Sequence, residues 1–157
     1  MADDIFLKLA GIPGASQDPS HKGEIDVLAW SWGLSESQAG AGAGAGKANF
    51  QDLSIQKLTD VASPKLMAAT AGGTNISDAI LTVRKAGKVP QYYLVLNMQN
   101  VMLTSMTMQE SKAQDGPQET IMIKYGRIAF EYGSIKGDGT KQSQVSVGWD
   151  VVTNKAV

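Results

Sequence analysis

The sequence predicts a mainly β fold, an antiparallel β-barrel of about eight strands flanked by one short α-helix. Several segments alternate side chains with the period of two that half-buried strands show, and they are rich in β-branched and aromatic residues. Glycine-rich or polar turns separate these segments at nearly regular spacing. A closed or nearly closed barrel leaves the fewest strand edges unpaired, so it is the architecture that we expect.

The predicted strands are bounded by turn signals. They span residues 5–9, 24–34, 79–85, 91–97, 101–109, 119–132 and 145–152. Residues 86–90 are few enough to close a hairpin, and their glycine can supply a positive φ. Residues 111–117 form a polar turn between the two strands that flank them. These signals predict two pairs of neighbouring antiparallel strands.

The strand at residues 24–34 is apolar on both faces. Trp30 and Trp32 share one face, and Ser31 lies on the other. Both tryptophans are therefore predicted to pack in a core or at a subunit interface, where large rings bury much apolar area. A platform for stacking sugars is the alternative for this pair.

One helix interrupts the strand pattern. Ser63 is a residue type that caps helix N-termini, Pro64 suits the first helical position, and the glycines at 72–73 suit the exit. Such a short helix does not hold its shape alone in water. We therefore expect Leu66 and Met67 to pack it against the barrel.

An alanine-glycine segment at about residues 35–48 is predicted to be a flexible loop. It contains Gly40, Gly42, Gly44 and Gly46. A phosphate-binding loop is excluded because alanine stands at the first glycine position and another alanine follows the lysine. The strict alternation also fails the dinucleotide-binding fingerprint. Since its alanine-glycine part, residues 39–46, is uncharged and unable to pack on its own barrel, we expect the loop to order on contact with another molecule.

Length and composition bound the function. The 157 residues fit one domain, residues 1–157. A net charge of −1 lacks the basic field that nucleic acids require, and the chain has no cysteine for a disulfide or a thiolate metal site. No apolar stretch is long enough to insert into a membrane. The acidic start predicts no secretory signal peptide.

The residue types of active sites are present but scattered. His21 is the single histidine. The carboxylates considered are Asp52, Asp60, Glu110, Asp115, Glu119 and Glu131. No spacing among them indicates a catalytic, cofactor-binding or metal site, so an enzyme is not predicted. Two alternatives stay open: a monomeric barrel that binds carbohydrate or another small ligand, and a hydrolase that uses two of these acids.

A group of methionines offers adaptable side chains. Met98, Met102, Met106 and Met108 fall within one predicted strand region. Methionine fills irregular gaps in a core and also serves surfaces that accept varied partners. The sequence leaves both roles open for this group.

Three stretches of the chain resemble the hemolysin-coregulated protein (Hcp) family. The first comprises residues 5–9 (IFLKL), 21–25 (HKGEI) and 28–33 (LAWSWG); the second comprises 57–60 (KLTD) and 62–66 (ASPKL). The third and weaker stretch runs from Tyr93 to Val101, with Glu119 opening the long strand to Tyr125. The tryptophan strand followed at this distance by the Ser-Pro helix is the specific part.

The resemblance implies a structural role in type VI secretion and no enzyme activity. Members of this family form hexameric rings that stack into a hollow tube, which a contractile sheath drives outward behind a valine-glycine repeat spike protein. Small effector proteins are carried and chaperoned in the lumen. The resemblance thus implies a cytoplasmic subunit that is secreted through the machine, without a cofactor and without a cleaved signal peptide.

Two hypotheses about sites follow from the resemblance. Ser31 is expected to line the lumen and contact effectors, because a small hydroxyl side chain lets folded cargo approach. A tight position in the barrel core is the alternative for Ser31. The loop that holds Gly40, Gly42, Gly44 and Gly46 is expected to join stacked rings.

Overall fold

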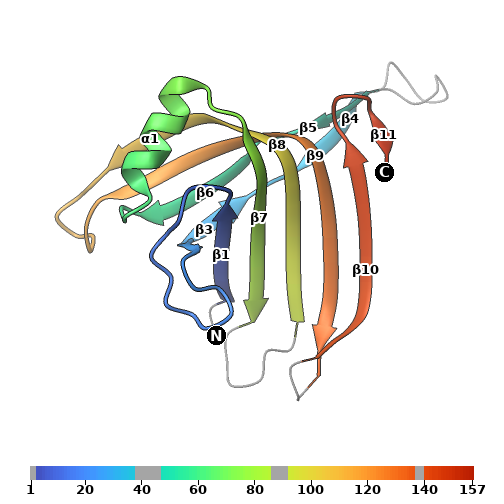
Figure 1. Cartoon of the computed structure of the whole chain (residues 1–157), viewed down its shortest axis with the longest axis horizontal. Helices are drawn as coiled ribbons and strands as arrows, with labels where there is room; N and C mark the ends of the chain where they lie inside the picture. Colours follow the sequence, from blue (N-terminus) through green and yellow to red (C-terminus); the bar gives the residue numbers. More distant parts are fainter. Residues whose placement is uncertain (1–2, 38–46, 86–91, 137–139) are drawn as a thin grey trace.

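The computed structural model describes residues 3–37, 47–85, 92–136 and 140–157. Within these ranges the chain forms eleven strands and one α-helix (Figure 1). The strands are β1 (Asp3–Leu9), β2 (Ile25–Asp26), β3 (Ala29–Ser31), β4 (Leu34–Ser37), β5 (Lys47–Phe50), β6 (Leu53–Leu58), β7 (Ile76–Lys85), β8 (Tyr92–Gln109), β9 (Gln118–Ile135), β10 (Lys141–Asp150) and β11 (Lys155–Ala156). The helix α1 spans Ser63–Gly72 between β6 and β7. The prediction of a mainly β protein with one short helix is confirmed.

Two long strands organise the barrel. β8 and β9 have 18 residues each and pair along their length, and both bend over toward α1 (Figure 1). A bulge between Leu103 and Ser105 and the positive φ of Asn100 (54°) mark the bend in β8. The bend divides the sheet into two walls with the core between them.

Each wall has its own strand order, and all pairs are antiparallel. The first wall runs β10, the second half of β9, the first half of β8, β7, β1 and β2. The second wall runs from the second half of β8 through the first half of β9 and β6 to β3. The predicted pairing of residues 79–85 with 91–97 is confirmed as β7 with β8.

The chain from β2 to β3 joins the two walls. The amide of Val27 donates to the carbonyl of Ile5 in β1 (3.0 Å), and the amide of Leu28 donates to the carbonyl of Gln56 in β6 (2.7 Å). The predicted single strand at residues 24–34 is therefore wrong: it is three short strands. It breaks because successive residues must change from one partner strand to another.

The core fills the space between the walls. Its fully buried side chains include Leu7, Ile25, Leu53, Ile55, Leu81, Leu96, Met98, Ile121 and Ile123. The helix covers one end of this core with Leu66 and Ala69. The expectation for Met67 is wrong, since this side chain is 61% exposed.

The helix ends as expected but begins differently. Gly73 has a left-handed φ of 57°, and its amide donates to the carbonyl of Thr70. The predicted cap at Ser63 is wrong, because the N-cap is Ala62 and no side chain caps the helix. Ser63 lies inside the first turn, followed by Pro64, and its Oγ accepts a hydrogen bond from the Asp60 amide (3.0 Å).

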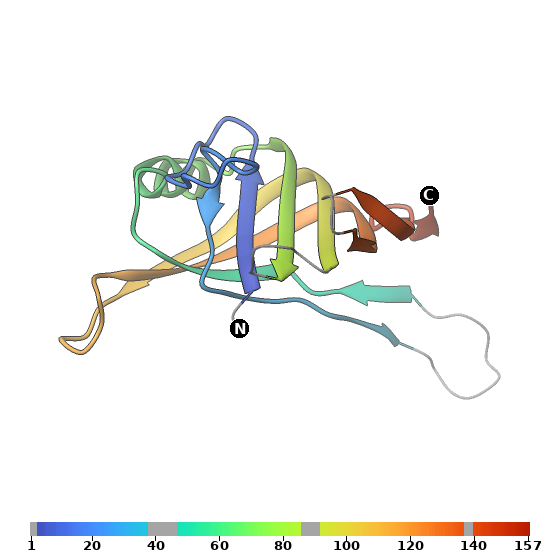
Figure 2. The same cartoon turned by 90° about the horizontal axis from the view of Figure 1, so that it is seen from below.

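Two hairpins extend beyond the barrel. In Figure 2 the β4–β5 arm projects from one end and the β8–β9 turn from the other. The arm pairs Leu34 with Phe50 and Ser37 with Lys47. The first and last residues of the predicted flexible loop at 35–48 therefore belong to strands β4 and β5. Residues 38–46, with Gly40, Gly42, Gly44 and Gly46, and the connection at 86–90 lie outside the described residues.

Candidate functional site

The outer face of the second wall carries small and polar side chains. We call it the polar face; it comprises Ala29, Ser31, Ser54, Gln56, Ser105, Thr107, Thr120 and Met122. The register places Ser31 opposite Ser54, and Ser54 opposite Met122. Neighbours in sequence point inward, as Ile55 and Ile121 do. The polar face is thus a continuous surface across four strands.

Ser31 is exposed on the polar face. The alternative that it fills a tight position in the core is therefore wrong. Trp30 and Trp32 are half-buried and pack against the core. Alternation thus separates the serine from the tryptophans as the sequence predicts. The structure by itself leaves the contact between Ser31 and an effector as a proposal.

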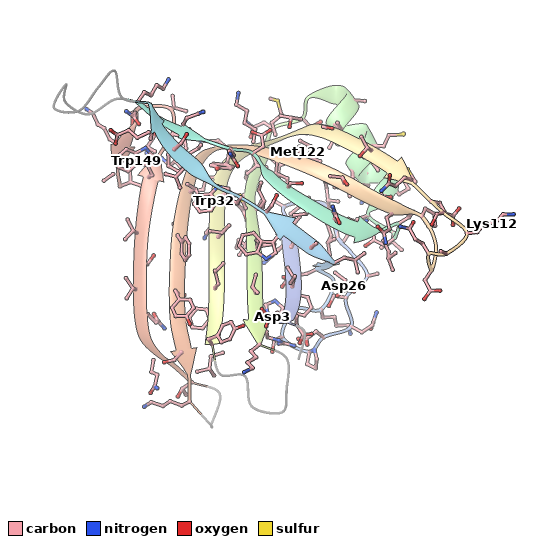
Figure 3. The ribbon with its side chains drawn as sticks, turned by 180° about the vertical axis from the view of Figure 1, so that it is seen from behind. Asp3, Asp26, Trp32, Lys112, Met122 and Trp149 are labelled. Atoms are coloured by element: carbon pink, nitrogen blue, oxygen red, sulfur yellow. The ribbon has the colours of Figure 1, made fainter. Side chains whose placement is uncertain are left out.

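Trp32 belongs to an aromatic cluster beside the first wall (Figure 3). Its ring centroid lies 6.2 Å from that of Phe130 and 6.4 Å from that of Phe50, and Phe50 stacks on Trp149 at 6.4 Å. The indole nitrogen of Trp32 donates to the hydroxyl of Tyr125. The ring and the indole nitrogen of Trp32 are thus engaged inside the subunit. Trp30 and Trp32 both pack against the core, so they form a poor platform for stacking a sugar.

An apolar strip continues from this cluster onto the surface. We define the strip as Phe130, Tyr132, Val145 and Val147; both valines are 66% exposed. Val145 faces Tyr132 and Val147 faces Phe130 across the β9–β10 ladder. In the described chain, residues 141–147 of β10 pair only with β9. An exposed apolar strip beside an unpaired strand edge is typical of a protein interface.

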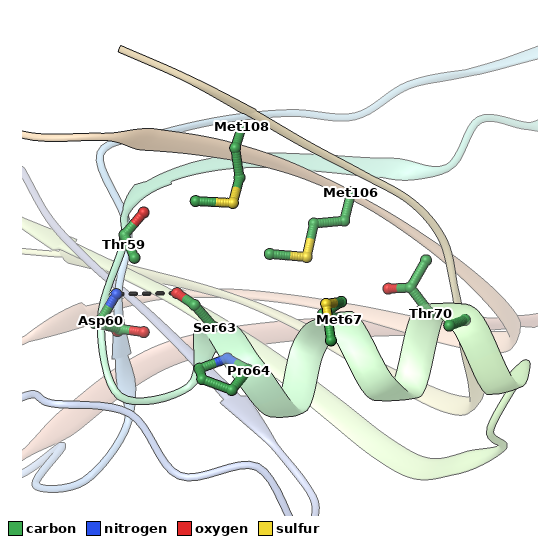
Figure 4. A pocket seen from close by; sticks show the side chains of 9 residues that line it. Thr59, Asp60, Ser63, Pro64, Met67, Thr70, Met106 and Met108 are labelled. Atoms are coloured by element: carbon green, nitrogen blue, oxygen red, sulfur yellow. Dashed lines mark hydrogen bonds between the residues drawn. The ribbon is translucent and has the colours of Figure 1, made fainter.

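A second apolar surface lies between α1 and β8. It is a groove of about 740 Å³ lined by Thr59, Asp60, Ser63, Pro64, Met67, Thr70, Ala71, Met106 and Met108 (Figure 4). Beyond Val101, β8 pairs in the described chain only with β9, so its other edge opens toward the groove. The methionines divide between two environments: Met98 is buried in the core, whereas Met108 is 56% exposed in the groove.

A buried charge cluster underlies the start of α1. The side chain of Lys57 is fully buried, and its Nζ donates to Glu119 Oε1 (2.9 Å), Asp60 Oδ1 (2.9 Å) and the carbonyl of Leu58 (2.9 Å). It also lies 3.3 Å from Ser63 Oγ. Burial raises the pKa of Glu119, but its hydrogen bonds and the Lys57 charge outweigh burial and hold that pKa below its usual value.

His21, Asp60 and Glu119 have partners within the subunit. His21 stacks on Phe6 with ring centroids 4.3 Å apart, and its Nδ1 lies 3.0 Å from Glu24. Asp60 and Glu119 meet, but they share the Lys57 ammonium group. The chain segments that the structure describes contain no group of three or more potential ligands for a metal ion.

The Lys57 cluster is the site that reasoning from sequence missed. Asp60 and Glu119 stand both among the scattered acids and in the stretches that resemble the family, but neither pattern indicates that they share Lys57. The available signal was a charged residue, Lys57, within an apolar strand pattern, because a charge at such a position needs a partner of opposite charge. Its partner Glu119 is 62 residues away, which no local pattern reveals.

Residues 6–132 match the family model described as "Type VI secretion system effector, Hcp". The chain belongs to the Hcp family. This Hcp chain is 43% identical to protein hcp1 of Pseudomonas aeruginosa over 159 residues, with 98% of each chain covered. The resemblance inferred from the three sequence stretches is therefore confirmed.

Solved structures agree with the family assignment. The crystal structure of Hcp1 from Salmonella typhimurium matches this Hcp chain with a TM-score of 0.82 and 33% identity, covering 100% of both chains. A structure described as a type six secretion system protein matches with a TM-score of 0.87 and 29% identity, covering 99% of this chain and 100% of that one. The fold and the link to type VI secretion thus rest on the whole length of the chain.

Within the described residues, no helix has the length and hydrophobicity that a membrane crossing requires.

Proposed function

We propose that this chain is the tube subunit of a type VI secretion system. Its copies form a hexameric ring, the rings stack into a tube, and small effector proteins are carried and chaperoned inside. The observation that supports this proposal most directly is the presence of two different apolar surfaces, the strip and the groove, on opposite flanks of one subunit.

A ring made of head-to-tail contacts needs two unlike surfaces on each subunit. The strip belongs to β9 and β10, and the groove lies between α1 and β8. Figure 1 shows α1 and β10 on opposite flanks of the barrel. Burial of a large apolar side chain contributes about 1.5–3 kcal/mol, so contact between the two surfaces supplies a driving force for association. The exposed strand edges on both flanks fit the same role.

The polar face supplies the wall of the channel in this proposal. The second wall ends in β3 on one side and in β8 on the other, and neither outer edge is paired in the described chain. Adjoining second walls would therefore form a continuous lining of small and polar side chains. Ser31 contacts effectors from this lining, and the lack of large side chains around it leaves room for cargo.

Stacking and machine contacts use other parts of the subunit. The β4–β5 arm projects from the barrel (Figure 2), and in the sequence its two strands flank the segment with Gly40, Gly42, Gly44 and Gly46. We assign ring stacking to this arm. The further partners are the valine-glycine repeat spike protein at the tip and the contractile sheath outside. The subunit is then cytoplasmic until assembly and is secreted through the machine.

Mass photometry and negative-stain imaging of the purified protein test the proposal. The expected particle is a six-membered ring, and a monomer would favour the ligand-binding alternative. Val147→Glu places a charge on the strip and is expected to give monomers. Ser146→Glu is the matched control, since Ser146 is exposed on the same strand but alternates to the opposite face. Intact rings of Val147→Glu would contradict the placement of the interface on the strip.

A further inference from the structure

The Lys57 cluster, defined as Lys57, Asp60, Ser63 and Glu119, joins three elements of the fold. Lys57 lies near the end of β6, Glu119 near the start of β9, and Ser63 in the first turn of α1. Asp60 binds Lys57 Nζ through Oδ1, and the same oxygen accepts the Ala62 amide (2.9 Å). The directional bonds of one ammonium group therefore fix where the helix leaves the sheet.

Stability alone does not account for this cluster. Lys57 and Glu119 are 0% and 1% exposed, so both charges lose their hydration on folding. Replacing a buried ion pair with apolar side chains of similar volume is often neutral or stabilising. What such side chains cannot supply is direction, because apolar contacts tolerate sliding and rotation.

The first turn of α1 has little else to hold it. The helix buries only Ser63, Leu66 and Ala69, and no side chain caps its N-terminus. Leu66 and Ala69 fix its distance from the core but leave its tilt weakly determined. Ser63 is the buried residue of the first turn, and its hydroxyl binds the Asp60 amide and approaches Lys57 Nζ.

The same first turn forms one wall of the groove. Asp60 and Ser63 line the groove as well as belonging to the cluster, and Figure 4 shows Met67 one turn further along α1, facing Met106. A change in helix tilt would move Met67 relative to β8. The width of the groove thus depends on the cluster.

We propose that the Lys57 cluster is a positioning centre that sets α1 so that the groove accepts the apolar strip of a second copy of this chain. This proposal rests on the proposed function, because it takes ring assembly as the purpose of the groove. Lys57 and Glu119 are fully buried and act through the helix, without contacting the neighbouring subunit themselves.

The double variant Lys57→Met/Glu119→Met tests it, since apolar side chains replace both buried charges. The expected melting temperature is close to the parent's, whereas the ring dissociation constant, measured by dilution and mass photometry, rises at least about tenfold. Hydrogen exchange at the α1 amides, including that of Leu66, is expected to speed up at least about tenfold in samples matched for oligomeric state. Leu81→Ala, which opens a cavity in the first wall, is the control. It is expected to lower the free energy of unfolding without changing the ring dissociation constant or the α1 exchange.

Three results would overturn the proposal. The first is a double variant with the parent's ring dissociation constant and unchanged α1 exchange. The second is a double variant that does not fold, because the cluster would then serve folding itself. The third is a loss of ring stability in Leu81→Ala as large as that in the double variant. A monomeric parent would contradict the proposed function instead, and α1 exchange would still decide whether the cluster positions the helix.

Discussion

The indole nitrogen of Trp32 donates a hydrogen bond of 2.5 Å to the hydroxyl of Tyr125, 93 residues further along the chain. The hydroxyl donates in turn to the carbonyl of Gln51 (2.7 Å). These bonds join the chain after β3 to β9 and to the residue after β5. Trp32 is thereby held against β9, and the state of the Tyr125 hydroxyl reports on the contact between these segments.

The first prediction concerns alkaline unfolding. Burial raises the pKa of Tyr125 from 10.0 to about 12, although the bond from Trp32 lowers it. A folded-state pKa above the unfolded one contributes stability that is complete below pH 10 and is lost as pH rises through about 12. Urea unfolding between pH 9 and 12 is expected to show a smaller loss in Tyr125→Phe than in the parent. An equal loss in both would show that Tyr125 does not carry this dependence, and Tyr132→Phe is the exposed control.

The second prediction concerns acid. The pKa of Glu119 is held below its usual value of 4.5, so its contribution is present above pH 4.5 and is lost as pH falls through the folded-state pKa. Asp18, through its bond from Arg84, and Asp150, through the Thr153 amide, act in the same direction. Asp26 acts in the opposite direction, because burial raises its pKa.

Glu119→Gln separates this contribution from the others. At pH 7 the variant leaves Asp60 as the acidic partner of Lys57 and is expected to lose about 1.5–3 kcal/mol of unfolding free energy. The difference between parent and variant should shrink below pH 4.5, where the parent's carboxylate takes up a proton. A difference that stays constant from pH 7 to 3 in chemical denaturation would contradict the assignment.

The third prediction separates packing from docking on α1. Leu66 is fully buried, so Leu66→Ala should cost about 2–5 kcal/mol of unfolding free energy. Met67 is exposed in the groove, so Met67→Ala should change that free energy by less than about 0.5 kcal/mol yet weaken the ring. Denaturation of dilute monomer and mass photometry of the ring give the two measurements. Rings of Met67→Ala as tight as the parent's would remove this side chain from the interface.

The fourth prediction concerns cargo. Because Ser31 is exposed on the polar face, Ser31→Gln should preserve folding and rings, with a change in unfolding free energy below about 0.5 kcal/mol. Retention of co-purified effectors should fall, since the longer side chain occupies space in the lumen. Ser146→Gln, exposed on β10, is the control. Unchanged retention in Ser31→Gln would place effector binding elsewhere.

The fifth prediction concerns stacking. Removal of residues 40–45, which lie between β4 and β5 in the sequence, is expected to leave single rings intact while tubes are lost. Negative-stain imaging under conditions in which the parent forms tubes distinguishes the two states. Folded monomers would instead assign the arm to the lateral interface.

The sequence by itself determined the fold class, the family and several local features. Two-residue alternation reflects the geometry of a strand, and it predicted that Ser31 and Trp32 lie on opposite faces. The left-handed turn at Gly73 was predictable because glycine tolerates it. Local patterns were sufficient wherever a residue's conformation depends mainly on its neighbours in the chain.

Only the tertiary structure decided which strands distant in the sequence meet and which charges lie together. Residues 24–34 divide among three strands because β1, β6 and β5 are successive partners. Two predicted strands merge into β8 because β9 pairs along both. Lys57 and Glu119 meet only through the pairing of β6 with β9. Pairing depends on backbone hydrogen bonds between distant segments, and these bonds carry no side-chain signal in the sequence.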